Sequence, residues 1–290
     1  MTANDAVTDN GTVTDDDTPD RRKAVLVAAE RLWDARVSAT PCTPVRDVLG
    51  AANVDAAYAV QELVLERRTA TGRRLVGRKI GLTSPAVQAQ LGVDQPDFGP
   101  ILDTMVRADG EHVHRSEFLQ PRVEGEVAFV LGADLDDPRS TVVDVLRATD
   151  FLLPAIEVVD SRIAGWDIAI TDTIADDASS GAVVLGTTPV SPRGLDLTEV
   201  ALALEHDGEL VSSGVGAACL GSPARAVTWL ARESARRGRP LRAGEVVLSG
   251  ALGPMADLTR PGRYRAELSG LGHVELLLVD DEPSHREATR

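Results

Sequence analysis

The sequence predicts an α+β fold that is rich in β structure. After residue 74 the chain consists mainly of short apolar runs separated by turn residues, which is typical of strands. Helical periodicity is most extended before that point, and helices and strands do not alternate regularly along the chain. A doubly wound parallel sheet requires regular alternation and is therefore disfavoured. No internal repeat is visible, and 290 residues suffice for one large domain with a small helical portion.

The chain begins with an acidic segment. Residues 1–20 contain six aspartates and no lysine or arginine, and large apolar side chains are scarce there. Such a segment cannot bury enough apolar surface to offset the entropy lost on ordering, so we expect a disordered tail.

Two helices are expected next. Apolar residues recur at helical spacing from Arg21 to about Val37 and again from Asp55 to Thr71. Asp55 is a suitable cap for the second helix and Gly72 a suitable end. We assign residues 21–73 to an N-terminal helical portion, which packs either on the main domain or on another subunit.

Residues 74–280 are expected to form the β-rich main domain, followed by a short tail at 281–290. It is expected to begin with a strand at 75–82, a short helix opened by Ser84 and Pro85 and running to Leu91, and a turn at 95–100. A strand at 123–131 and a helix capped near Ser140 or Thr141 follow. After these we expect an apolar segment at 152–159, a long loop at 161–180 and a strand at 182–185.

The C-terminal part of that domain carries the strongest local signals. The dipeptide Asp207-Gly208 favours a tight hairpin, because both residues tolerate the left-handed backbone that such a turn needs. The expected elements are hairpin strands at 200–205 and 209–213, a helix bracketed by Ser222, Pro223 and Gly238, a strand at 244–249, and two strands within 264–279 that fold back at 269–272.

Composition excludes several functional classes. The net charge is −15 and no basic stripe is present, so binding to nucleic acid or to an anionic membrane is not expected. Only Cys42 and Cys219 occur, which predicts a reducing, cytoplasmic setting without a disulfide framework. No export signal and no membrane-spanning apolar run is visible, so we expect a soluble protein that is not exported.

Three glutamates form the main candidate site. In the run PRVEGEVAFVL (121–131), Glu124 and Glu126 fall on one face of an extended strand, with Cα atoms roughly 7 Å apart. Glu157 lies in the apolar segment at 152–159. Like charges in apolar surroundings repel unless water or a cation separates them, and an all-oxygen ligand set favours Mg²⁺ or Mn²⁺ over zinc. A solvated strand face is the alternative interpretation of the same spacing.

Several segments carry a family resemblance. They are GRKIGLTSPAVQAQLGVDQPDFG (77–99), QPRVEGEVAFVL (120–131), PAIEVVDSRIAGW (154–166), DTIADDASSG (172–181) and LSGALGPM (248–255). In this order they resemble the 2-hydroxypenta-2,4-dienoate hydratases of the fumarylacetoacetate hydrolase superfamily, over most of the chain from about Asp55 to Val279. The resemblance implies a mixed β-roll or distorted barrel with the active site in its mouth.

The resemblance also implies a reaction and a set of roles. Members of that family add water to a 2-hydroxydienoate, through its 2-oxo tautomer, to give a 4-hydroxy-2-oxo acid. By resemblance Glu124, Glu126 and Glu157 hold Mg²⁺ or Mn²⁺, and Lys79 and Asp97 are the acid/base candidates. The implied substrate-binding residues are Thr83, Ser84, Arg162, Ser179, Gly250 and Leu252.

The residues themselves leave alternatives open. Lys79 could be an ordinary exposed lysine, Asp97 a turn former, and Arg162 either a partner that fixes the glutamates or part of a surface ion pair. The chain also departs from the family at Asp177, where an asparagine is common. A carboxylate there removes two hydrogen-bond donors and adds negative charge.

Other functions remain open at this stage. A 2-oxo-3-hexenedioate (4-oxalocrotonate) decarboxylase, a related 2-oxo-dienoate hydratase or an acylpyruvate hydrolase would share the metal site, although LSGALGPM and VDQPDFG look more like the hydratase. A noncatalytic partner of such an enzyme and a regulatory metal-binding protein are further alternatives. The resemblance implies a homo-oligomer, with a possible complex with a pathway decarboxylase or aldolase.

Overall fold

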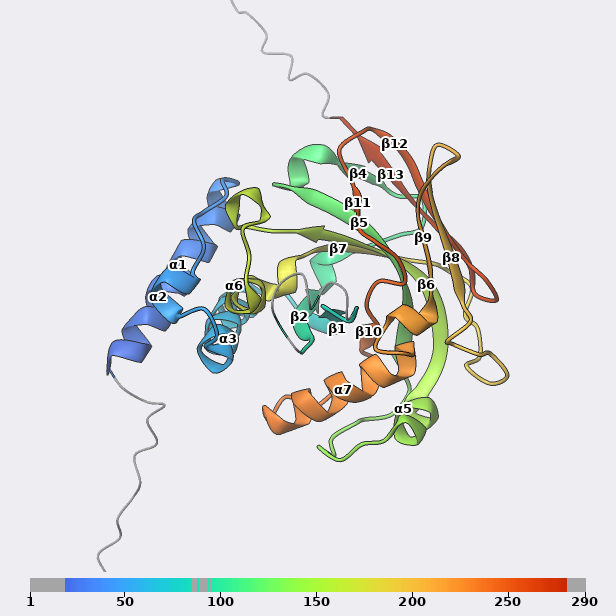
Figure 1. Ribbon diagram of the computed structural model, residues 1–290, viewed down its shortest axis with the longest axis horizontal. Helices are drawn as coiled ribbons and strands as arrows, with labels where there is room; N and C mark the ends of the chain where they lie inside the picture. The colour runs from blue at the N-terminus through green and yellow to red at the C-terminus, as the bar shows by residue number, and fades with distance from the viewer. Residues whose placement is uncertain (1–18, 85–87, 89–92, 94, 281–290) are drawn as a thin grey trace, which may run out of the picture.

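Two β-sheets form the body of the protein, and helices pack around them (Figure 1). The structure, a computed structural model, describes residues 19–84, 88, 93 and 95–280. The larger sheet runs in the order β2-β1-β10-β5-β6-β7-β3, with β11 paired to β5, and the smaller one in the order β4-β13-β12-β8-β9. This architecture confirms the expected β-rich α+β class.

The larger sheet is built around its two longest strands, β5 and β6, which pair antiparallel. Its strands are β1 (Leu75–Gly81), β2 (Asp97–Leu102), β3 (Val106–Arg107), β5 (Pro121–Leu131), β6 (Thr149–Asp160), β7 (Ser180–Leu185), β10 (Val246–Leu248) and β11 (Ala256–Asp257).

The smaller sheet contains the predicted hairpins. Its strands are β4 (His112–His114), β8 (Ala201–His206), β9 (Glu209–Val215), β12 (Gly262–Leu268) and β13 (Gly272–Val279). Asp207 and Gly208 both adopt positive φ between β8 and β9, as the tight turn requires.

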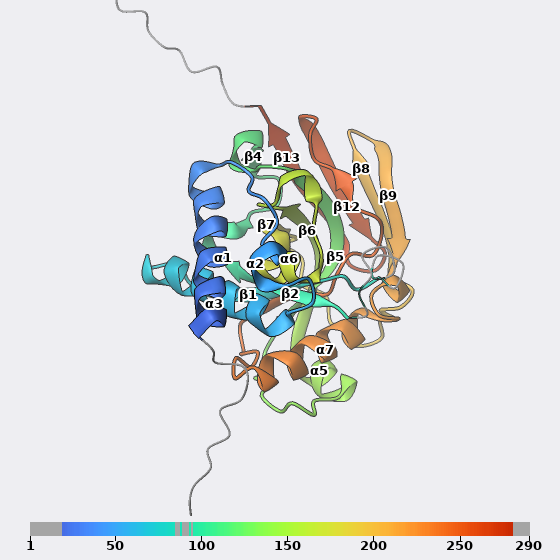
Figure 2. The ribbon, with the colours of Figure 1, turned by 60° about the vertical axis from the view of Figure 1, so that its left-hand side comes forward.

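The helices lie at two places on the sheets. α1 (Pro19–Ser38) contacts both α2 (Arg46–Leu49) and α3 (Val54–Ala70), and α3 also packs on α6 (Ile170–Ala175). α5 (Val142–Ala148) packs on α7 (Pro223–Arg236) at a second place. Figure 2 shows these two groups as separate clusters. No helix in the described ranges has the length and apolarity that a membrane crossing requires.

The cap of α5 agrees with the sequence-based expectation, and the cap of α3 differs from it. Thr141 caps α5 as expected, because its hydroxyl accepts a hydrogen bond from the Asp144 N–H. At α3 the cap is Asn53 and not Asp55, since the Asn53 side chain accepts from the Ala56 N–H. α1 begins at Pro19, so the last two residues of the predicted tail are helical. The rest of that tail, most of the short helix predicted from Ser84 to Leu91 and the tail at 281–290 lie outside the described residues.

Two expectations about local structure were wrong. The sequence predicts a turn at 95–100, but Asp97 begins β2, which pairs antiparallel with β1. Pro100 is tolerated because β2 is the last strand in the sheet order, where a missing N–H costs least. The long loop expected at 161–180 contains the buried helix α6. That helix is short and gains its stability from packing on α3, which no local pattern reveals.

Candidate active site

The strand register of β5 and β6 gathers the three predicted glutamates. Glu124 and Glu126 alternate on β5 and share a face, and Glu157 on β6 is the direct register partner of Glu124. One carboxylate oxygen from each residue lies within 4.8 Å of the other two. Glu126 and Glu157 are fully buried and Glu124 is half-buried, so the cluster opens to solvent only on the Glu124 side.

The electrostatics of this cluster suit the binding of a cation. Burial, together with the nearby Glu157 charge, raises the pKa of Glu124 to about 7 and that of Glu126 well above its usual range. Glu126 Oε1 and Glu157 Oε2 accept no hydrogen bond from the described residues. Buried carboxylates with free oxygens are costly unless a cation compensates them, and three carboxylates suit a hard divalent ion. The residues present therefore form a possible metal-binding cluster.

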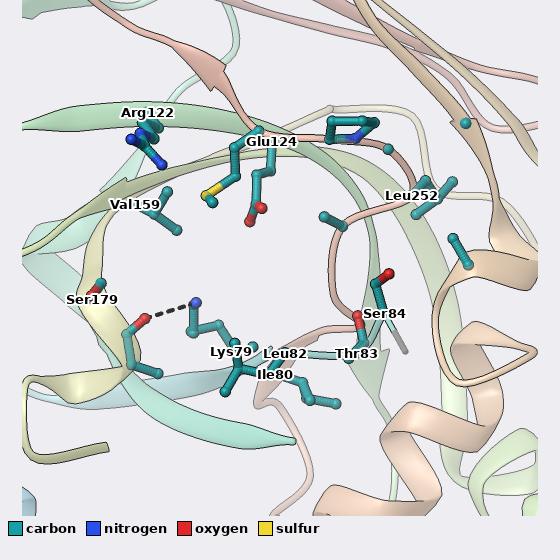
Figure 3. A pocket seen from close by; sticks show the side chains of 18 of the residues that line it. Lys79, Ile80, Leu82, Thr83, Ser84, Arg122, Glu124, Val159, Ser179 and Leu252 are labelled. Carbon is teal, nitrogen blue, oxygen red and sulfur yellow. Dashed lines mark hydrogen bonds between the residues drawn. The ribbon is translucent and has the colours of Figure 1, made fainter. Parts of the chain in front are cut away.

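Lys79 lies beside the carboxylate cluster. Its ammonium group is 3.1 Å from Glu157 Oε1 and donates a 2.9 Å hydrogen bond to the carbonyl oxygen of Ala178 (Figure 3). Burial alone would lower the pKa of this lysine, but the charges of Glu157 and Asp97 outweigh burial and raise the pKa above its ordinary value. Lys79 is therefore a buried cation and not the exposed surface lysine that its neighbours also allowed.

Asp97 reaches the same place from β2. It is buried, and its Oδ2 accepts a 2.7 Å hydrogen bond from the Thr173 hydroxyl, while Oδ1 has no hydrogen-bond partner among the described residues. Burial raises its pKa, against the opposing effect of Lys79. The close approach requires a glycine opposite, because a Cβ on Gly81 would lie 2.2 Å from Asp97 Oδ1. A carboxyl group with a raised pKa and one free oxygen is suited to proton transfer.

A cavity of about 670 Å³ joins these groups. It is lined by seven of the residues expected at the site: Lys79, Thr83, Ser84, Asp97, Glu124, Ser179 and Leu252. Glu126 and Glu157 are buried next to Glu124 and are not among the lining residues. Apolar side chains such as Ile80, Leu82 and Ile168 complete much of the lining. A concave, largely apolar space with a few convergent polar groups is the usual form of a small-molecule site.

Gly250 supports the cluster from outside the cavity. Its N–H donates a 2.7 Å hydrogen bond to Glu126 Oε2, and its φ of +99° favours glycine. A Cβ at this position would lie 2.3 Å from the Thr83 hydroxyl. Gly250 thus orients a glutamate through its backbone, and Leu252, also in the 248–255 segment, contributes to the cavity wall.

The structure does not bring Arg162 to the cavity. Its guanidinium group is paired with the Asp176 carboxylate and donates to the carbonyl oxygens of Asp160 and Ser180 at 2.6 and 2.8 Å. Because it is buried and bonded in this way, Arg162 fixes the segment before β7, and it is not among the residues that line the cavity.

Asp177 also points away from the cavity. Its carboxylate Oδ2 lies 2.9 Å from Arg36 on α1 and 3.2 Å from Arg68 on α3. The charge that departs from the family pattern is therefore compensated by the N-terminal helices. The segment Asp177–Ser179 has positive φ at all three residues, and its central residue, Ala178, supplies the carbonyl oxygen that holds Lys79.

The cavity residues missed by sequence reasoning include Arg122, Trp166, Thr173 and Ala178. Arg122 could have been found, since it precedes Glu124 by two positions and so shares its strand face. Trp166, Thr173 and Ala178 belong to the segment that was read as a loop, and no local signal placed them at the site.

Comparisons with known proteins identify the relatives of this chain. The model of the family described as fumarylacetoacetate (FAA) hydrolase, C-terminal, matches residues 80–278. The chain is 52% identical to the 2-keto-4-pentenoate hydratase of Paraburkholderia xenovorans (strain LB400), over 89% of this chain and 94% of that protein. It is 54% identical to the TodF product hydratase of Pseudomonas putida (strain F1), over 88% and 95%.

A solved structure has the same fold over most of the chain. The 4-oxalocrotonate decarboxylase from Pseudomonas putida G7, complexed with magnesium and adipate, superposes with a TM-score of 0.85 at 32% identity and covers 89% of this chain and 98% of its own. A second structure of that enzyme contains calcium and acetate. From the matched family model and the extent of these similarities, the chain belongs to the fumarylacetoacetate hydrolase family.

Proposed function

We propose that the protein is a metal-dependent hydratase that adds water to 2-hydroxypenta-2,4-dienoate, through its 2-oxo tautomer, and yields 4-hydroxy-2-oxopentanoate in meta-cleavage aromatic catabolism. The observation that carries the proposal is the buried Glu124–Glu126–Glu157 cluster beside Lys79 and Asp97 in one cavity. Relatives that match the chain over most of their length bear hydratase names.

The glutamates would hold Mg²⁺ or Mn²⁺. When bound there, the cation would polarise the carboxylate and the C2 oxygen of the substrate and would stabilise the negative charge that develops on them. Glu126 is oriented for this task by the Gly250 N–H, and Glu157 by Lys79.

Lys79 and Asp97 have separate tasks in this proposal. Lys79 keeps its proton because of the carboxylates around it, so its ammonium group attracts the acidic end of the substrate. Asp97, whose pKa is raised by burial, moves a proton between its free Oδ1 and a substrate carbon while water adds. Apolar side chains on the cavity wall limit access of other water molecules to the reacting bond.

The test is an ultraviolet assay with freshly generated 2-hydroxypenta-2,4-dienoate. The purified protein is measured with Mg²⁺, with Mn²⁺ and after chelation, and the product is identified by mass. A metal-dependent gain of one water molecule supports the hydratase. Release of CO₂ from a dicarboxylic 2-oxo acid, without hydration, would instead identify a decarboxylase.

The assembly and setting of the enzyme are part of the same proposal. We infer a homo-oligomer in the cytoplasm, with possible association with a decarboxylase or aldolase of the same pathway. Light scattering of the purified chain, alone and mixed with such an enzyme, tests the two forms of assembly. Absence of turnover in folded, metal-loaded protein would favour a noncatalytic partner.

A further inference from the structure

Arg122 is a cation at the edge of the cavity that the proposed reaction does not use. It stands two residues before Glu124 on β5, so the two side chains share a strand face. Both line the cavity, and Figure 3 shows Arg122 on the same side of it as Glu124, with Lys79 opposite. Among the described residues that line the cavity, Lys79 and Arg122 are the two with cationic side chains.

The guanidinium group of Arg122 is held in place by an aromatic ring. Its Cζ lies 4.6 Å from the ring centroid of Trp166. The indole N–H of Trp166 donates a 3.1 Å hydrogen bond to the Gln120 carbonyl oxygen, which anchors the ring to the start of β5. Stacking of this kind occupies the face of a guanidinium group and leaves its N–H edges available for an anion.

Arg122 forms no hydrogen-bonded ion pair with the described residues. Its charge opposes the rise in the pKa of Glu124, and its ion-pair partner Asp257 is 3.7 Å away from Nε to Oδ1, which is too long for a hydrogen bond. The Asp257 side chain is 77% exposed, so water screens this pair. Lys79, by contrast, is already paired with the buried carboxylate of Glu157 and lies beside the glutamate cluster. Arg122 therefore retains the capacity to bind an anionic group of a ligand.

The spacing of Arg122 and Glu124 along β5 and the wall beside them suit the carbon chain of a substrate. The Cα atoms of residues two apart in a strand are separated by roughly 7 Å, which is on the order of the length of a six-carbon dicarboxylate. The side chains of Val159, Ile168 and Met255 present apolar surface to the cavity. Its volume of about 670 Å³ also exceeds what a five-carbon acid fills.

We propose that Arg122, stacked on Trp166, is a specificity-determining residue that binds a second carboxylate at the end of the substrate remote from the glutamates. The protein then accepts 2-oxo acids and 2-hydroxydienoates that carry a terminal carboxylate, in addition to the monocarboxylate. This inference rests on the proposed function, because it requires that the 2-oxo acid end lies at the glutamate cluster.

The test compares two ligands that differ only at the far end. 2-Oxoadipate and 2-oxohexanoate have six carbons each, and only the former has a terminal carboxylate. Their affinities for the Mg²⁺-loaded protein are measured by calorimetry, together with their competition against the hydratase substrate. We expect 2-oxoadipate to bind roughly 10-fold more tightly, the size of effect of one charged hydrogen-bonded contact.

Variants at Arg122 isolate the contact. In Arg122→Met the two ligands should bind with about equal affinity. Arg122→Lys should keep part of the preference for 2-oxoadipate, because a lysine retains the charge but not the planar guanidinium group. Thermal melting and Mg²⁺ affinity report whether each variant is folded. Trp166→Leu, which removes the stacking platform, should also reduce the preference.

Two results would overturn the proposal at different levels. Equal affinity of the wild type for both ligands, or equal weakening of both in Arg122→Met, contradicts a terminal-carboxylate contact and leaves the hydratase intact. Failure of both 2-oxo acids to bind the Mg²⁺-loaded wild type removes the premise and counts against the proposed function as well.

Discussion

At the scale of single residues, the site is defined by charge that the protein does not neutralise by itself. Glu124, Glu126 and Glu157 lie together in a region where Lys79 is the cation paired with one of them and Arg122 acts on Glu124 from a greater distance. The raised pKa of Glu124 and the free oxygen atoms of Glu126 and Glu157 are the physical signs of this imbalance. The function of each side chain can therefore be tested through metal binding as well as through turnover.

The first prediction concerns Glu126→Gln. This change should lower Mg²⁺ affinity and activity by at least about 100-fold and leave the fold intact, because an amide is a poorer ligand for a hard cation than a carboxylate. Mg²⁺ titration followed by calorimetry is the measurement. The exposed residue Glu199 provides the control, since Glu199→Gln makes the same chemical change at the surface. Normal metal affinity in Glu126→Gln would contradict the proposed ligand set.

The second prediction concerns Lys79→Met. Loss of the buried cation should lower kcat by about 100-fold or more, and it should also strengthen Mg²⁺ binding, because the positive charge beside Glu157 competes with the metal. Kinetics and metal titration on the same preparation separate these effects. Lys23→Met is a matched control at an exposed position of α1. If kcat stayed at the wild-type value, Lys79 would not take part in the reaction.

At the scale of elements, the N-terminal helices support the site through one carboxylate. Arg36 of α1 and Arg68 of α3 both reach Asp177, and the next residue, Ala178, binds Lys79. Positive φ at three successive non-glycine residues, Asp177–Ser179, is unfavourable, so the surrounding contacts must hold this segment. The helices thus contribute to the position of Lys79 as well as to packing.

The third prediction concerns Asp177→Ala. It leaves Arg36 and Arg68 without their buried partner and should lower the free energy of unfolding by about 3 kcal/mol, as loss of one partner of a buried ion pair does. If the segment positions Lys79, kcat should fall while Mg²⁺ affinity is retained. Chemical denaturation and kinetics are measured together.

The control for this variant is a surface ion pair of the same helical portion. Asp47 pairs with Arg31 and is 56% exposed, so Asp47→Ala should change stability by less than about 1 kcal/mol. An Asp177→Ala protein as stable and as active as the Asp47→Ala protein would show that the arginine contacts do not hold the segment.

At the scale of the whole molecule, the sheet order gathers the site from distant parts of the chain. β10 lies between β1 and β5, which places Gly250, just after β10, against Glu126. β2 brings Asp97 to the cavity beside Lys79, and the segment before β7 brings the Ala178 carbonyl oxygen to the Lys79 ammonium group. Metal bound at this junction should therefore stabilise the whole fold, since the unfolded chain has no preformed site.

The fourth prediction is that this stabilisation depends on pH. In the metal-free protein the pKa of Glu124 is about 7, against an ordinary value of 4.5, so the folded state binds more protons than the unfolded state between these values. Stability of the metal-free protein should fall as pH rises through this window. Metal binding requires deprotonated carboxylates and strengthens over the same range.

Thermal melting with Mg²⁺ and with chelator measures this linkage. The increase in Tm caused by Mg²⁺ should be small at about pH 5 and larger at about pH 8. In Glu126→Gln the increase should be small at both values. If Mg²⁺ raised the Tm of the wild type by the same amount at both pH values, the glutamates would not lose protons when the metal binds.

Several parts of the fold and site were predictable because the responsible pattern is local. Alternation along β5 placed Glu124 and Glu126 on one face, and Asp207-Gly208 predicted the β8–β9 hairpin. These features depend on backbone geometry within a few residues. The family resemblance added Lys79 and Asp97, which local patterns alone left between catalytic and ordinary roles.

By itself the sequence determined the β-rich class, the alternation that places two carboxylates on one strand face, and the family. Only the tertiary structure decided that Glu157 pairs with Glu124, that Arg162 and Asp177 lie away from the cavity, and that Arg122 lies at its edge. The physical reason is that strand order, register and the packing of α6 on α3 depend on contacts between residues far apart in the chain. Such contacts leave no periodic pattern in the sequence.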